Sequence, residues 1–307
     1  VKGKFPIGFF IWNTGIKEKF EEAESDIYDS KGDFIGNKKF IDTSNEKSIN
    51  DWLITTRNRI NETNLGFLSA KGNDFQNVNF IFIINNKSQL PHPRGTWVTD
   101  KNIIEVSIYV SVRHCIKATW LNDRDQFVYP NDSWQTDKEF QNDCLTFTLF
   151  NNSNNITSSE GTNHWIPFTE YEVNAQAKFE STFMTDFIKG KIKQEATTTD
   201  LFTNGVVSSS EVENSQNKPL VFSEEATAVF DAGRALWHYY HAQKDVNVNA
   251  SLYDIRAHFQ GRNDKGRMNS KSDDAAYMQI IGALRESLKT LAEKIKPKVY
   301  DYGFLKP

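Results

Sequence analysis

Apolar residues in the first third of the chain form short runs between polar turns, a pattern that predicts strands. Phe5–Trp12 is apolar throughout, which is typical of a strand covered on both faces. Phe20–Tyr28 and Phe34–Ile41 flank a polar turn in which Gly32 can adopt a positive φ, so they predict a β-hairpin. Two later apolar runs predict further strands, Gly66–Ser69 and Val78–Ile84.

Helical periodicity begins near residue 44 and dominates the second half of the chain. Ser44 or Asn45 is a candidate N-cap for a short helix that includes Trp52 and Leu53. After the candidate cap Thr99, apolar residues fall on one helical face, although they also alternate as in a strand; length and the cap favour a helix up to Cys115. The remaining predicted helices are Thr136–Phe150, Glu170–Ile188 ending near Gly190, one from Ser223 to about Gln243, Ser251–Gln260, and one from Asp273 or Asp274 that ends before Pro297.

The segment 194–218 is the strongest candidate for a domain boundary. It is rich in Ser, Thr, Asn and Gln and has little apolar periodicity. The sequence therefore predicts an α+β fold in which a mixed strand-and-helix region, 1–193, is followed by a linker, 194–218, and an all-helical segment, 219–307.

Composition and charge restrict the class of protein. Charged residues make up 25% of the 307 and aromatic residues 13%, as in folded globular chains. No apolar run is long enough to span a bilayer, and no signal peptide is apparent, so we expect a cytoplasmic protein with no membrane partner and with Cys115 and Cys144 as buried thiols. The net charge of −4 is uneven: 251–307 hold 11 Lys and Arg against 7 Asp and Glu, whereas 122–180 hold 3 against 10.

Several catalytic motifs are absent from the sequence. There is no phosphate-binding Gly-x-x-x-x-Gly-Lys loop, no Gly-x-Ser-x-Gly elbow and no Pro-Pro dipeptide. His238 and His241 are three residues apart on a predicted helix without an apparent third ligand, which favours aromatic packing over a metal site. A nuclease alternative would use three strand carboxylates with Lys38 on the next strand, but a solvated hairpin face is the simpler interpretation; the carboxylates are those of Glu22, Glu24 and Asp26.

Candidate DNA contacts are basic residues in loops and beside predicted elements. The strongest signal is the Gly-bracketed segment 260–267, which combines Lys and Arg with amide side chains between two predicted helices. An ordinary charged surface loop is the alternative. The full set of candidate DNA-binding residues is Lys38, Lys39, Arg57, Arg59, Arg94, Arg113, Arg262, Lys265 and Arg267.

Four stretches, in the same order along the chain, resemble segments of large bacterial DNA adenine-N6 methyltransferases of the type I-like and fused restriction-modification group. The first, Phe-Pro-Ile-Gly-Phe-Phe-Ile-Trp, is similar to the strand that follows the catalytic core in those proteins. The stretches are 5–12, 111–123 (Ser-Val-Arg-His-Cys-Ile-Lys-Ala-Thr-Trp-Leu-Asn-Asp), 163–168 (Asn-His-Trp-Ile-Pro-Phe) and 228–240 (Ala-Val-Phe-Asp-Ala-Gly-Arg-Ala-Leu-Trp-His-Tyr-Tyr).

The resemblance implies the C-terminal, DNA-facing region of such an enzyme. By analogy, Phe5 or Phe9 would approach the flipped adenine, and residues after about Asp42 would serve recognition and assembly. The Gly-rich turn for S-adenosylmethionine and the acidic/amide-Pro-Pro-aromatic tetrapeptide are missing, so we expect the cofactor to bind the parent protein and this chain alone to be inactive. The start at Val1, without Met, favours a part of a longer protein.

The partners that the resemblance implies are double-stranded DNA and, in addition, specificity or restriction subunits. A competing hypothesis makes the chain a docking module for a specificity or motor subunit with no direct base contacts. The acidic region 122–180 and the helical segment favour docking for at least part of the chain. Salt-dependent DNA binding distinguishes the two hypotheses.

Overall fold

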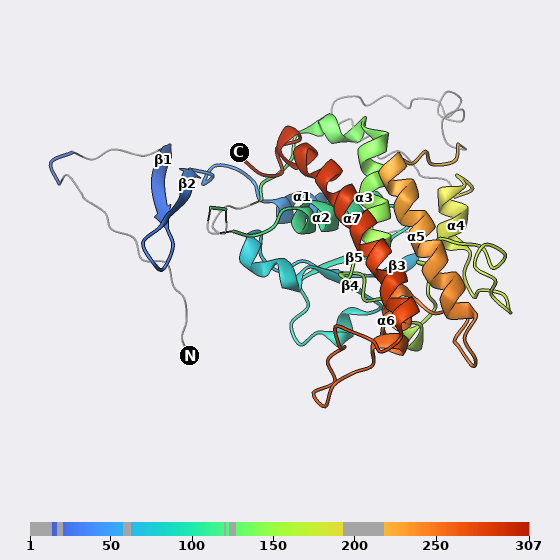
Figure 1. The fold of residues 1–307 in the computed structure, drawn as a ribbon. Coiled ribbons are helices and arrows are strands. Elements are labelled where there is room, and N and C mark those ends of the chain that lie inside the picture. The colour runs from blue at the N-terminus through green and yellow to red at the C-terminus, as the bar shows by residue number, and fades with distance from the viewer. Residues whose placement is uncertain are drawn as a thin grey trace, which may run out of the picture. The chain divides into compact units, whose positions relative to one another are not determined.

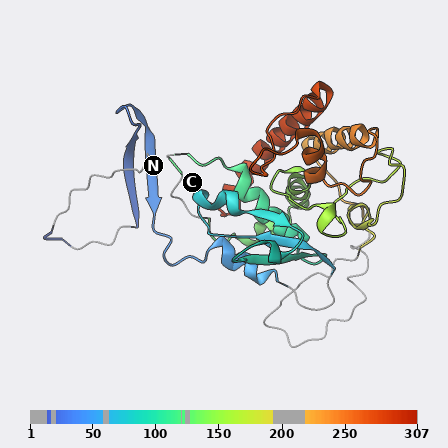
Figure 2. The ribbon, with the colours of Figure 1, turned by 90° about the horizontal axis from the view of Figure 1, so that it is seen from below.

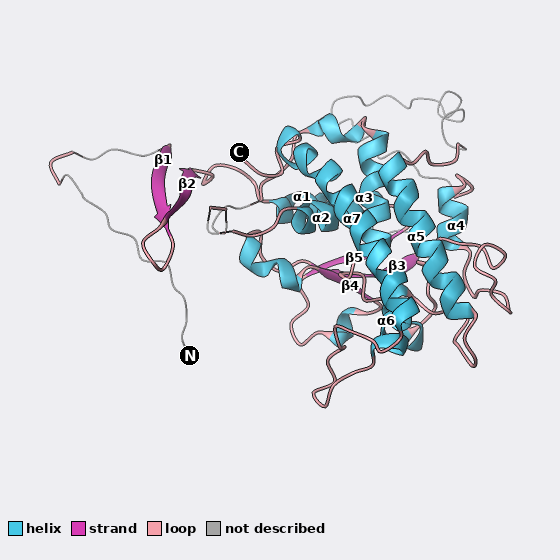
Figure 3. Ribbon diagram, in the orientation of Figure 1, coloured by secondary structure: helices cyan, strands magenta, loops and turns pink. Residues whose placement is uncertain are grey.

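The computed structural model describes residues 14–16, 21–57, 63–119, 121–122, 127–192 and 218–306. The chain divides into two compact units: an N-terminal unit of residues 1–45 and a main unit of residues 46–307. The predicted strand Phe5–Trp12 lies outside the described residues. Strands and helices are both present, and they mix within the main unit, which confirms the α+β class (Figures 1 and 3).

The N-terminal unit contains the predicted hairpin. Strand β1 (Glu22–Tyr28) pairs antiparallel with β2 (Phe34–Ile41). The turn is fixed by Asp29, whose carboxylate accepts the backbone N–H groups of Lys31 (2.7 Å) and Asp33 (3.0 Å). Gly32 has a φ of 89°, the left-handed conformation that the turn requires.

A three-stranded antiparallel sheet and a short helix open the main unit. The short helix α1 (Ile49–Thr55) begins one turn later than the sequence indicated, because Ser48 forms a capping box with Asp51. The central strand β3 (Asn64–Ser69) pairs on one side with β4 (Phe82–Ile84) and on the other with β5 (Gly95–Thr99). The apolar run before β4 forms a 3₁₀ helix, 75–80, and β5 was not predicted.

The described residues of the main unit include six further helices; α2 packs against the sheet, and α3, α5 and α7 pack against one another. Helix α2 lies between the sheet and the other long helices and is buried on nearly all sides, which explains why its apolar residues also alternate like those of a strand. Figure 2 shows α5 and α7 side by side, as their contacts require. The helices are α2 (Ile103–Cys115), α3 (Lys138–Phe150), α4 (Phe183–Ile188), α5 (Glu224–His241), α6 (Leu252–Gln260) and α7 (Ala275–Asp301).

Two further predicted helix boundaries are wrong for identifiable reasons. The helix predicted from Glu170 occupies only α4, because the carboxylates of Glu170 and Glu172 accept backbone N–H groups of nearby residues and stabilise turns instead. Helix α7 continues through Pro297. Pro297 and Glu293 are both exposed, so water can bond the Glu293 carbonyl that loses its helical partner.

The helices on either side of 194–218 belong to the same compact unit. Apart from Lys218, this predicted linker lies outside the described residues. Buried side chains of α2, α3, α5 and α7 form one continuous hydrophobic core, which includes Leu145, Leu236 and Leu288. The helical segment 219–307 thus shares its core with the α+β region.

We expect Gly233→Ala to lower the free energy of unfolding by about 1–3 kcal/mol. Gly233 is in α5 where that helix meets α3, and an added Cβ would lie 2.2 Å from Cε1 of Phe150. Gly282→Ala in α7 is the matched control, because a Cβ there meets nothing within 4 Å and helix propensity should give about 0.5–1 kcal/mol of added stability. Urea unfolding measures both; equal changes in the two variants would contradict the close approach.

Candidate functional site

The structure removes two candidate DNA contacts from the accessible surface. Arg113 is fully buried (0% exposed), and its guanidinium donates to the carbonyl oxygens of Gly72 (2.8 Å) and Asp74 (2.7 Å). Lys38 is 2% exposed. Phe5, Phe9 and Arg59 lie outside the described residues, so their proposed roles have no structural description.

The hairpin does not bring Lys38 to its carboxylates. In the strand register, Ser25 faces Lys38, which places Lys38 on the opposite side of the ribbon from the alternate residues Glu22, Glu24 and Asp26. On the carboxylate side, Lys39 forms an ion pair with Glu22 (Nζ–Oε2 2.8 Å). Across the described residues there is no group of three or more side chains that could hold a metal ion, so the arrangement required for the nuclease alternative is not formed there.

The two histidines of α5 lie in different surroundings. His238 is exposed, whereas His241 is buried, with Nδ1 3.2 Å from the Val173 carbonyl oxygen and Nε2 3.3 Å from that of Val248. Burial is the main cause that lowers the pKa of His241, and the two carbonyl contacts oppose it. His241 therefore ties α5 to two loops of the core.

Two basic residues that are distant in sequence meet beside β5. The Nη2 of Arg57 donates to the Gly95 carbonyl oxygen (2.7 Å), next to Arg94. Both arginine side chains are exposed. The sequence identified each of them separately, and the fold brings them together because Arg57 follows α1 and Arg94 immediately precedes β5.

Residues 261–269 form a basic loop with a defined shape. The ends pair through an isolated bridge between Arg262 and Met268, and the side-chain oxygen of Asn263 accepts the N–H groups of Lys265 (3.0 Å) and Arg267 (3.1 Å). The guanidinium of Arg262 turns back, donating to the Gly266 carbonyl oxygen (3.0 Å). Lys265 and Arg267 are exposed at the tip, where their charged groups form no hydrogen bond or ion pair with the described residues.

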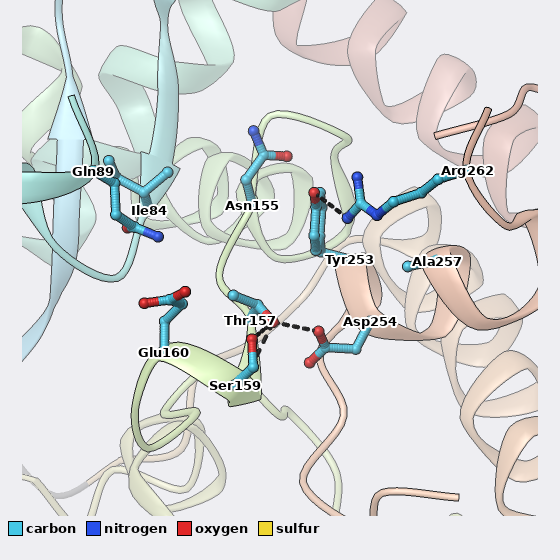
Figure 4. Close-up of a pocket in the computed structure, with 10 residues that line it drawn as sticks. All are labelled: Ile84, Gln89, Asn155, Thr157, Ser159, Glu160, Tyr253, Asp254, Ala257 and Arg262. Carbon is cyan, nitrogen blue, oxygen red and sulfur yellow. Dashed lines mark hydrogen bonds between the residues drawn. The ribbon is translucent and has the colours of Figure 1, made fainter. Parts of the chain in front are cut away.

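A polar cleft of about 470 Å³ lies beside this loop (Figure 4). Gln89 and Ile84 lie on one side of it and Tyr253 and Arg262 on the other, with Asn155 between them. The phenol of Tyr253 accepts a hydrogen bond from Nη2 of Arg262 (2.6 Å), which fixes that guanidinium at the cleft. The remaining lining residues are Thr157, Ser159, Glu160, Asp254 and Ala257.

Asp254 is a structural carboxylate of this cleft. It accepts hydrogen bonds from the Thr157 hydroxyl (2.5 Å), from the N–H and hydroxyl of Ser158 (both 2.8 Å) and from the N–H of Ser251 (3.0 Å). These bonds join α6 to the loop 155–160. With its oxygens engaged and no histidine or cysteine among the described lining residues, the cleft provides hydrogen-bonding groups but no paired nucleophile and base.

Comparison with known proteins gives no assignment for this chain. No family model, curated protein or solved structure matches it. Over the part of the chain that the structure describes, no helix is both long and apolar enough to cross a bilayer.

Proposed function

We propose that this chain is the DNA-recognition and assembly portion of an S-adenosylmethionine-dependent DNA adenine-N6 methyltransferase of a restriction-modification or phage-defence system. The methyl-transfer centre and the cofactor would belong to the parent protein. The proposal rests on the resemblance of four stretches of sequence and on the basic loop 261–269 beside a polar cleft.

Buried side chains of the second, third and fourth resembling stretches belong to the core of the main unit. Phe168 of the third stretch packs against two aromatic residues of the fourth, with ring centroids 6.3 Å from Phe230 and 5.6 Å from Trp237. In the second stretch, the Ser111 hydroxyl bonds the Cys144 carbonyl oxygen in α3 (3.0 Å). Buried residues of this kind support a shared fold, whereas DNA contacts must come from the surface.

The observation that carries DNA binding is the exposed tip of the basic loop. Lys265 and Arg267 project from a loop whose backbone is held by Asn263 and Arg262, so little ordering is required when they meet phosphates. Gln89 and Asn155 in the adjacent cleft carry amide groups of the kind that bond base edges.

We expect Lys265→Ala/Arg267→Ala to weaken duplex binding and to reduce the slope of log K against log salt by about 2 units, because each neutralised phosphate adds about 0.9 to that slope. The control Lys178→Ala/Lys244→Ala removes two exposed positive charges elsewhere and should leave the slope unchanged. The measurement is a salt titration of duplex affinity by fluorescence anisotropy. A salt slope in the loop variant equal to that of the unsubstituted chain would contradict the proposed contacts.

The docking-module alternative is favoured by one feature of the N-terminal unit. Tyr28 and Phe34 form an edge-to-face pair near the hairpin turn and remain 56% and 55% exposed. Exposed aromatic pairs are typical anchors of protein interfaces. If duplex binding by the unsubstituted chain does not depend on the basic loop, docking becomes the better account of this chain.

A further inference from the structure

One side of the polar cleft carries a hydrogen-bond donor and an acceptor that form no bond with the described residues. Gln89 ends the short 3₁₀ helix 87–89, where its Oε1 accepts the Asn86 N–H (3.0 Å), so its Nε2 remains as a donor. The carboxylate of Glu160 has no hydrogen bond or ion pair within the described part of the chain. Both side chains line the cleft, and in Figure 4 their polar ends point toward one another.

The opposite side of the cleft carries a fixed cation, Arg262. Its guanidinium is held by two hydrogen bonds, one of them to the Tyr253 hydroxyl (2.6 Å), so other N–H donors of the group remain for a ligand. Arg262 forms no ion pair with a described carboxylate. Lys265 and Arg267 follow in the same loop, against the single carboxylate of Asp264, so the loop is positively charged.

These groups define the chemistry of a ligand that bonds to both sides. It carries a donor next to an acceptor at one end and an anion at the other, which is the pattern of a base edge joined through a sugar to a phosphate. A zwitterionic amino acid fits less well, because its ammonium group offers no acceptor to Nε2 of Gln89. The cleft volume of about 470 Å³ lies in the range of small-molecule sites. Ile84, Ala257 and the Tyr253 ring provide apolar contact for a flat base.

We propose that this cleft binds a single unpaired nucleotide, with its base edge at Gln89 and Glu160 and its phosphate at Arg262. Asn155, between the two sides, has a side-chain amide that forms no hydrogen bond with the described residues and is available to the base or the sugar. A base inside a duplex has its pairing edge occupied, so the site selects a base outside the stack. Assigning the nucleotide to DNA rests on the proposed function, whereas the binding of a mononucleotide does not.

The site is tested by calorimetric titration of the full chain with each of the four deoxynucleoside 5′-monophosphates. Deoxyribose 5-phosphate is the matched probe that lacks a base. We expect at least one mononucleotide to bind about tenfold or more tightly than deoxyribose 5-phosphate, because the base adds two hydrogen bonds and one of them is to a charged group. Equal affinity for all of these probes, or saturable binding of none, overturns the inference.

Gln89→Ala/Glu160→Ala removes the groups assigned to the base edge and leaves Arg262 in place. It should lower the mononucleotide affinity to that of deoxyribose 5-phosphate without changing the latter, a result that a general loss of folding does not give. Gln176→Ala/Glu286→Ala, which removes an exposed amide and an exposed carboxylate elsewhere, should keep the difference. If the double variant does not fold, Glu160→Gln keeps the size of the side chain and should still weaken mononucleotide binding severalfold. Full mononucleotide affinity in the folded variant contradicts the assigned contacts.

A second arm compares a duplex that carries one unpaired, bulged nucleotide with a fully paired duplex of the same length. Binding of the bulged duplex that is tighter by about tenfold, and that loses this advantage in Gln89→Ala/Glu160→Ala, assigns the site to DNA. Equal binding of the two duplexes, with mononucleotide binding intact, assigns it to a free nucleotide. Mononucleotide binding without any DNA binding refutes the proposed function and leaves the cleft site standing. Duplex binding through the basic loop without mononucleotide binding has the opposite meaning.

Discussion

Arg113→Ala is expected to lower the free energy of unfolding by about 3–5 kcal/mol. The side chain is fully buried, joins α2 to the segment 72–74 through two carbonyl oxygens, and lies over the ring of Phe127 with 4.9 Å from Cζ to the centroid. Its removal leaves the Gly72 and Asp74 carbonyls without these donors and opens a cavity between α2 and that segment. Urea unfolding followed by circular dichroism measures the loss.

Arg113→Lys tests whether the forked guanidinium is responsible. A single ammonium can reach one of the two carbonyl oxygens but cannot reproduce the planar pair of donors, so we expect an intermediate loss. The duplex affinity of the folded fraction should be unchanged in both variants, since Arg113 is buried. A stable Arg113→Ala variant with weakened duplex binding would instead restore Arg113 as a DNA contact.

The example of Arg113 shows what local sequence pattern omits. The apolar periodicity around it predicted helix α2 correctly, but its acceptors lie in a turn 41 and 39 residues earlier in the chain. Nothing in the spacing of residues 99–115 indicates that this turn will cover the side chain. A helix can therefore be predicted from its own residues, while the burial of a charged residue on it depends on the tertiary fold.

Helix starts were predictable where the capping group is local. Ser223, Ser251 and Asp274 each accept the N–H of the residue three positions later, and each follows a polar segment that interrupts the apolar periodicity. Strand β5 was missed because its pairing with β3 determines it more than its own short sequence does. The α+β class was predictable because hairpin and helix signals are both strong.

The candidate site was predictable only in part. The loop containing Arg262, Lys265 and Arg267 stands out in the sequence because glycines bracket a basic, amide-rich segment. Gln89 and Asn155 do not, because they have no local motif and are brought to the cleft by tertiary contacts.

A second large effect is expected for Lys294→Met, in an ion cluster that joins three helices. Nζ of Lys294 in α7 lies 2.9 Å from carboxylate oxygens of Glu139 in α3 and Glu225 in α5, and 3.7 Å from that of Asp143, whose side chain is only 2% exposed. Removing the cation leaves three carboxylates together. We expect a loss of about 2–4 kcal/mol at pH 7, less than for a fully buried pair because Lys294 is 29% exposed.

The pH dependence of this loss follows from Asp143. Burial raises the pKa of Asp143, and the charge of Lys294 opposes that rise, so in Lys294→Met the folded-state pKa should rise further. A raised carboxyl pKa means that the folded state binds the proton more readily than the unfolded state, so stability increases as the pH falls through the folded-state pKa. The free energy of unfolding that Lys294→Met loses relative to the unsubstituted chain should therefore become smaller as the pH falls from neutral toward that pKa.

The pKa of Lys294 itself does not produce this trend. Burial alone would lower it, but the bonds to Glu139 and Glu225 raise it above its ordinary value, so its contribution is complete at neutral pH and is lost only in strong alkali. Asp143→Asn/Lys294→Met is the matched control, because Asn can still accept the Ser223 hydroxyl and leaves no buried charge. We expect this double variant to be more stable than Lys294→Met at pH 7. Its stability deficit should not become smaller as the pH falls. Urea unfolding from neutral pH toward the folded-state pKa of Asp143 measures the stability of both variants. A stability deficit of Lys294→Met that does not change with pH would show that lost packing, rather than an uncompensated Asp143 carboxylate, causes the loss.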